Sequence, residues 1–89
     1  MRVSKDFIPR EIAGEFMLVP IGKATEKFNG LIAVNEVGFF IFSALNEERT
    51  EDELIEKILS EYDIDKETAQ KDLSDFLNQL RQIGALIED

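Results

Sequence analysis

Residues 28–42, Phe-Asn-Gly-Leu-Ile-Ala-Val-Asn-Glu-Val-Gly-Phe-Phe-Ile-Phe, decide the fold class because they contain both kinds of apolar pattern. The first part, 28–34, is apolar and partly β-branched, which predicts a strand with Gly30 as a bulge or close-approach point. Asn35 is a favourable helix cap. Residues 36–45 are then apolar on most sides, which predicts a helix central to the core.

Two further strands are predicted before this segment. Residues 7–13 and 16–21 are apolar runs separated by Gly14, which is a hairpin signal. Pro9 and Pro20 suit an edge or a strand end, because proline donates no ladder hydrogen bond. A simple antiparallel meander would leave one edge of the third strand without a partner.

Two helices are predicted after it. Thr50 and Glu53 match a capping box, and the apolar spacing that follows predicts an amphipathic helix over residues 51–61. Asp65 opens a third helix, and Gly84 stands where a left-handed terminating residue is wanted. We therefore expect an α+β fold, a three-stranded antiparallel sheet followed by three helices in a winged-helix-like arrangement.

Length and composition limit the function. A chain of 89 residues supports one hydrophobic core, so residues 1–89 are expected to form a single domain. The chain has no Cys and no His. These absences remove disulfides, Cys/His zinc sites and the usual general base. We expect no catalytic site, no metal and no cofactor.

The net charge of −9 lies entirely in the second half of the chain. Residues 1–45 hold equal numbers of acids and bases, whereas residues 46–89 carry the whole excess of acids. Phosphate backbones and anionic membranes are poor partners for such a surface. With no apolar run of about 20 residues and no signal segment, a cytoplasmic location is expected.

Two groups of residues could be mistaken for functional sites. Asp72 and Asp75 lie three positions apart on the third helix, but no His or Cys accompanies them in acid/base work. Phe39, Phe40 and Phe42 could stack on nucleobases, yet their helical spacing in an apolar segment favours core packing. Neither group predicts catalysis or nucleic-acid binding.

Several segments in combination resemble the PqqD family. They cover nearly the whole chain and comprise Val19-Pro20, residues 28–38 with Phe-Asn-Gly and Asn-Glu-Val-Gly, residues 50–54, residues 71–80 with Asp-Leu-Ser-Asp-Phe-Leu-Asn-Gln-Leu, and Gly84. The resemblance implies a recognition element for ribosomally made, post-translationally modified peptides. In that family the domain binds the leader of a precursor peptide between its third strand and third helix, and presents it to a modifying enzyme, often a radical S-adenosylmethionine protein.

The resemblance and the open strand edge together give a candidate peptide-binding site, formed by strand addition. Its expected residues are Asn29, Gly30, Leu31, Ile32, Ala33 and Val34 on the strand, and Asp72, Asp75, Phe76 and Gln79 on the third helix. The acidic helix also predicts a leader that carries Lys or Arg near this contact.

Two other functions remain open at this point. A winged-helix regulator that binds nucleic acid would suit the same order of helices, although the acidic third helix argues against it. A self-associating accessory subunit could use the same strand edge for a second copy. A monomer or weak dimer is expected, and the size of the protein alone and with a leader peptide would separate these cases.

Overall fold

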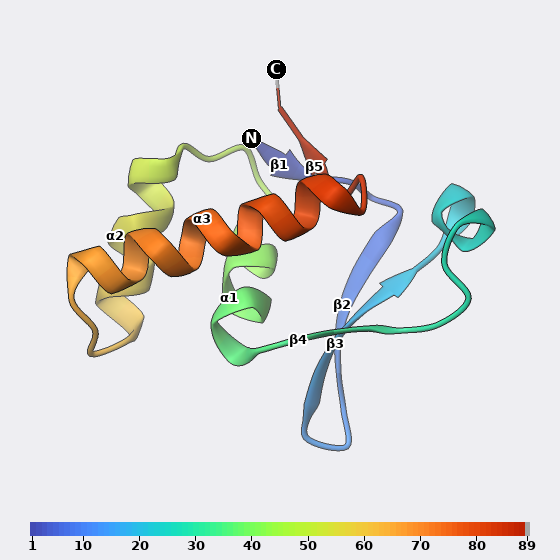
Figure 1. Cartoon of the computed structure of the whole chain (residues 1–89), viewed down its shortest axis with the longest axis horizontal. Coiled ribbons are helices and arrows are strands. Elements are labelled where there is room, and N and C mark those ends of the chain that lie inside the picture. Colours follow the sequence, from blue (N-terminus) through green and yellow to red (C-terminus); the bar gives the residue numbers. More distant parts are fainter. Residues whose placement is uncertain (89) are drawn as a thin grey trace.

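The computed structural model describes residues 1–88 and confirms the α+β fold class (Figure 1). Along the chain the elements are β1 (Arg2–Val3), β2 (Phe7–Ile12), β3 (Glu15–Pro20), the 3-10 helix η1 (Gly22–Glu26), β4 (Ile32–Val34), α1 (Glu36–Ala44), α2 (Glu51–Glu61), α3 (Lys66–Gln82) and β5 (Leu86–Ile87). Strands β2, β3 and β4 form the predicted antiparallel sheet in that order.

A tight hairpin sets the register of this sheet. Ala13 and Gly14 connect β2 to β3, with φ of 53° and 81°. Positive φ at both loop residues is the signature of a type I′ turn, whose twist matches that of the strands it joins. The closing pair is Ile12 with Glu15, and β4 then lies antiparallel to β3 on its other side.

The third strand is shorter than the sequence predicts, and Gly30 is not a bulge within it. Residues 28–31 form a loop, and pairing begins only at Ile32. The ring of Phe28 instead packs edge-on against Phe7, with ring centroids 5.7 Å apart. If the register continued, Gly30 would face Pro20, which has no N–H to donate. The ladder therefore ends where its partner strand loses a donor.

The predicted helix signals lie where the helices begin. The side chain of Asn35 accepts the Gly38 N–H at 2.7 Å at the start of α1. Thr50 forms the predicted capping box at the start of α2. The Asp65 carboxylate accepts the first-turn N–H of α3. Each side chain satisfies a backbone donor that has no partner within its helix.

The helices and the sheet enclose one apolar core. Its largest fully buried side chains come from β3, the three helices and the C-cap of α1: Leu18, Ile41, Phe42, Leu45, Leu54, Ile58, Leu77 and Leu80. Helix α1 is less enclosed than predicted, because Phe39 and Phe40 are only half-buried. The ring centroids of Phe39 and Phe16 of β3 are 4.8 Å apart, whereas the ring of Phe40 packs edge-on against Tyr62, just after α2.

The two ends of the chain form a ribbon that the sequence did not predict. Strands β1 and β5 pair antiparallel, Arg2 with Ile87 and Val3 with Leu86, so the first residues of the chain lie beside residues 86–87 (Figure 1). Gly84, with φ of 72°, ends α3 as predicted and turns the chain into β5. Within residues 1–88 no helix is both long enough and apolar enough to cross a membrane.

Candidate functional site

The three-stranded sheet has two outer edges, and they differ chemically. The edge formed by β2 contains Pro9, which has no N–H, and the carbonyl of Pro9 accepts a hydrogen bond from the Arg10 guanidinium at 2.9 Å. Proline and charged side chains are common devices for protecting a sheet edge from further pairing. Edge β2 is therefore poorly suited to accept another strand.

Within residues 1–88 no strand pairs with the outer edge of β4, and the register shows which residue this edge offers to a ligand. At the end of β2 and β3 opposite the turn, the Ile21 N–H donates to the Asp6 carbonyl. Hydrogen-bonded and non-hydrogen-bonded pairs alternate along an antiparallel ladder from that point. This alternation aims the backbone groups of Leu18 and Phe16 at β4 and those of Met17 away from it. Ala33, opposite Met17, therefore points its N–H and C=O outward.

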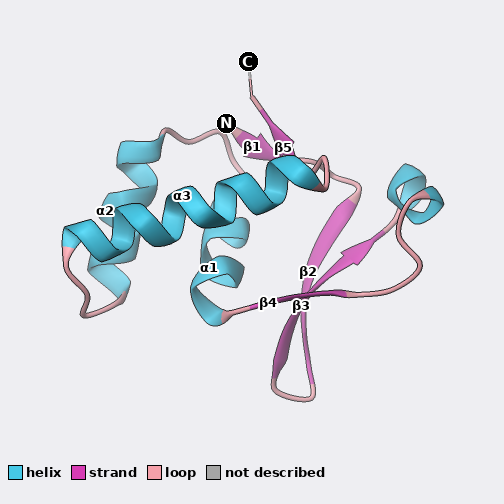
Figure 2. Ribbon diagram, viewed as in Figure 1, coloured by secondary structure: helices cyan, strands magenta, loops and turns pink. Residues whose placement is uncertain are grey.

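A groove of about 420 Å³ lies between β4 and α3. Figure 2 shows β4 leading directly into α1, with α3 crossing above them in this view. Its lining consists of Ala33, Val34, Asn35, Val37, Gly38, Asp72, Asp75, Phe76 and Gln79. The structure thus brings together six of the residues that the sequence analysis proposed, two from the strand and all four from the helix.

A close contact between helices forms the floor of this groove. The ring of Phe76 is only 7% exposed and lies directly against Gly38. A Cβ atom added at Gly38 would stand 2.8 Å from Cε1 of that ring, which is too close for real atoms. Glycine at this position therefore keeps the ring down in the floor and the groove open above it.

Carboxylates dominate the electrostatics of the helical wall. Asp75 accepts a hydrogen bond from Lys71 at 2.9 Å, and this bond raises the pKa of the Lys71 ammonium. Asp72 is half-buried and makes no hydrogen bond or ion pair with another residue in the part of the chain that the structure describes. Its charge is thus available to a ligand.

The remaining predicted residues lie outside the groove. Asn29, Gly30 and Leu31 line a separate hollow of about 340 Å³ beside the end of β3, and Leu31 is 50% exposed. Ile32 packs against the core. The groove also includes three residues that were not proposed, Asn35, Val37 and Gly38. Only the capping signal of Asn35 hinted that this end of β4 meets α1.

Comparison with known proteins was decisive for the family. The model of the family "Coenzyme PQQ synthesis protein D (PqqD)" matches residues 15–86. The chain belongs to the PqqD family. A solved structure, "TbiB1 in Complex with the TbiA(beta) Leader Peptide", resembles this PqqD-family chain with a TM-score of 0.74 and 27% sequence identity over 100% of both chains. No curated protein sequence matches significantly.

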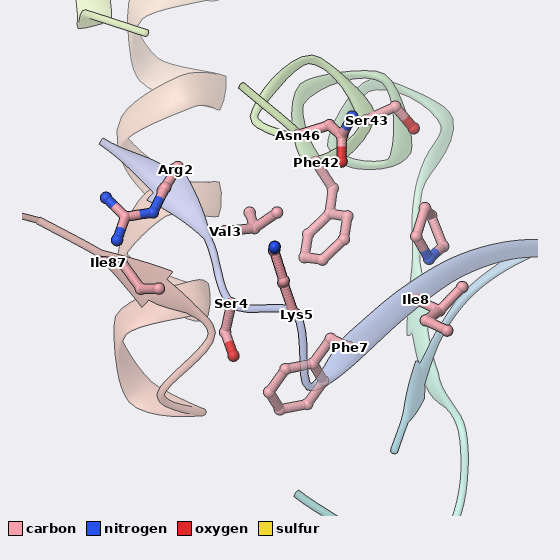
Figure 3. A pocket seen from close by; sticks show the side chains of 11 residues that line it. Arg2, Val3, Ser4, Lys5, Phe7, Ile8, Phe42, Ser43, Asn46 and Ile87 are labelled. Carbon is pink, nitrogen blue, oxygen red and sulfur yellow. The ribbon is translucent and has the colours of Figure 1, made fainter. Parts of the chain in front are cut away.

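The residues matched by the PqqD family model favour the groove as the candidate site over a larger cavity of about 660 Å³. That cavity lies between the terminal ribbon, β2 and the end of α1, and Figure 3 shows Val3, Phe7 and Phe42 around it. More than half of its lining lies outside residues 15–86, whereas every residue of the β4–α3 groove lies inside them. Of the three-stranded sheet, only β2 lies beside the larger cavity among the described residues, and its edge is the protected one. The open edge and the PqqD match thus coincide at β4.

Proposed function

We propose that this chain binds the leader segment of a ribosomally made precursor peptide as an added strand on β4. The observation that carries the proposal is the outward-facing N–H and C=O of Ala33 beside a groove walled by α3. An extended peptide there would gain main-chain hydrogen bonds at the edge, while alternate side chains would enter the groove.

Affinity and selectivity would come from different parts of this site. A main-chain hydrogen bond contributes about 0.5–1.5 kcal/mol net and depends little on sequence. Side chains that reach Phe76 and Val37 would bury apolar surface, at roughly 25 cal/mol per Å². The short length of β4, Ile32–Val34, limits pairing to a few leader residues, so selectivity depends on the few side chains that enter the groove.

The comparisons support a peptide ligand over the alternatives. TbiB1, similar over its whole length, is seen with a leader peptide. A nucleic acid would meet the groove wall at Asp72 and Asp75, and like charge would repel its phosphates. A second copy of this chain could also occupy the β4 edge, and the size of the protein in solution distinguishes that case.

We also propose a supporting role for the chain in a larger reaction. The bound leader would be presented to a modifying enzyme, such as a radical S-adenosylmethionine protein, in the cytoplasm. The chain itself would be non-catalytic and need no cofactor, because it has neither Cys nor His to supply a nucleophile or an ordinary general base. Within residues 1–88 no three acidic side chains are grouped to hold a metal ion.

Titration of the isotope-labelled protein tests this function. The ligands are leader peptides encoded by the reading frames beside the gene, and amide shifts are followed by NMR. We expect saturable shifts confined to β4, the start of α1 and the 72–79 part of α3. Saturable shifts confined to β2 and the terminal ribbon would overturn the site. Sizing without peptide should give a monomer or weak dimer, and a tight dimer that excludes peptide would favour self-association instead.

A further inference from the structure

The sheet register also determines which side chains of a bound strand reach α3. Ile32 and Val34 are half-buried and pack against the core, whereas Ala33 between them is exposed. A residue directly opposite Ala33 on an added strand shares its face of the sheet, whichever direction the strand runs. Its side chain therefore points away from α3, and its two sequence neighbours point into the groove.

The spacing of the groove wall fits two such side chains. Residues two positions apart on a strand are separated by roughly 7 Å. Along α3, Asp72 and Phe76 are separated by roughly 6 Å, because a helix rises about 1.5 Å per residue. One inward side chain can therefore meet the carboxylates while the other lies over Phe76 and Gly38.

The charge of the wall determines the chemistry of one of these side chains. The groove lining contains two carboxylates, and none of its described residues is basic. Asp72 makes no hydrogen bond or ion pair within residues 1–88, although Lys71 lies near enough to feel its charge, and Asp75 is hydrogen-bonded to the exposed Lys71. An acidic leader side chain would be repelled here, and an apolar one would leave Asp72 partly desolvated without compensation.

We propose that the leaders selected by this chain carry a Lys or Arg two positions from a large apolar residue, with the residue between them lying opposite Ala33. This inference rests on the proposed function and adds the class of substrate. Two observations lead to it. The outward direction of the Ala33 backbone determines which leader side chains point toward α3, and Asp72 and Asp75 give that wall of the groove its negative charge.

A library of random peptides of about 12 residues, displayed on phage, tests the pattern without a known leader. Peptides are selected on the full chain and counter-selected on the Ala33→Pro variant, so that those bound elsewhere are discarded. The retained peptides should share a basic and a large apolar residue at a spacing of two. Selection on the double variant Asp72→Asn, Asp75→Asn should keep the apolar preference and lose the basic one.

Individual peptides then give the size of the effect. Replacing the selected Lys by Met should weaken binding to the unaltered chain about 2- to 5-fold, as expected for a solvent-exposed ion pair. The same replacement should not weaken binding to the double variant. Circular dichroism of each variant checks that it is folded before its affinity is compared.

The possible failures are distinguishable. Retained peptides that lack a basic residue would overturn the charge inference while leaving strand addition intact. A basic and an apolar residue at an odd spacing would overturn the inference about which leader side chains point into the groove. If no peptide distinguishes the unaltered chain from the Ala33→Pro variant, the proposed function itself fails, and this inference falls with it.

Discussion

Replacing Ala33 by proline removes the outward N–H from the β4 edge without removing a bond between β4 and β3. The ladder to β3 is made by Ile32 and Val34, opposite Leu18 and Phe16, so it should survive the change. The structure already contains this arrangement in Pro9, an interior residue of the opposite edge strand. The variant should therefore fold with a melting temperature within a few degrees of the original, as proline is tolerated on edge strands.

The cost to binding follows from what the leader loses. One hydrogen bond, worth about 0.5–1.5 kcal/mol, disappears, and the leader carbonyl that it served is left partly desolvated at a cost of about 1–3 kcal/mol. These terms overlap, so we expect a total of about 1–3 kcal/mol. Because about 1.4 kcal/mol corresponds to a factor of ten, Kd should rise by roughly 5- to 150-fold.

Isothermal titration with a leader peptide measures this change, and two further variants control it. Ala33→Ser keeps the N–H and should bind like the original chain. Val34→Pro removes a donor that points at β3 and should lower the melting temperature far more than Ala33→Pro does. An Ala33→Pro variant that is folded and binds with unchanged affinity would refute strand addition at β4.

Three other perturbations test separate parts of the structure. Gly38→Ala should push the Phe76 ring up into the groove, because the new Cβ would lie 2.8 Å from Cε1 of that ring. Calorimetry should show weaker peptide binding together with a stability loss of about 1–3 kcal/mol. Unchanged peptide affinity would contradict the assignment of Phe76 and Gly38 to the floor of the groove. Thr50→Ala removes the α2 cap, far from the groove, so thermal unfolding should shift down by about 4–8 °C for a loss of about 1 kcal/mol while peptide affinity stays the same. The hydrogen bond from the Thr68 N–H lowers the pKa of the Asp65 carboxyl, so its contribution to stability is present above the unfolded pKa and is lost as pH falls through the folded value. Urea denaturation at about pH 6 and about pH 3 should show a smaller acid loss for Asp65→Asn, which caps without titrating, than for the original chain, and equal losses would argue against this linkage.

Elements with local signals were predictable from the sequence. The hairpin at Gly14 and the helix starts at Asn35, Thr50 and Asp65 each depend on a few neighbouring residues, and the structure has all four. The four α3 residues expected in the site line the groove beside β4. Their position on one border of an amphipathic helix is readable from its period.

Non-local contacts were not predictable in this way. The β1–β5 ribbon joins the two ends of the chain through strands of two residues each, too short to leave a pattern. The third strand begins later in the chain than predicted. Its late start depends on Pro20 in the partner strand and on Phe28 packing against Phe7. Gly38 had no visible role until α3 was placed over it.

Hydrogen exchange at the Ala33 amide tests the central claim most directly, because that N–H faces solvent in the free chain and a leader carbonyl in the proposed complex. With saturating leader peptide, we predict that the Ala33 amide becomes strongly protected while the amides of β2 exchange as before. A saturated complex in which Ala33 exchanges as fast as in the free chain would contradict peptide binding at this edge.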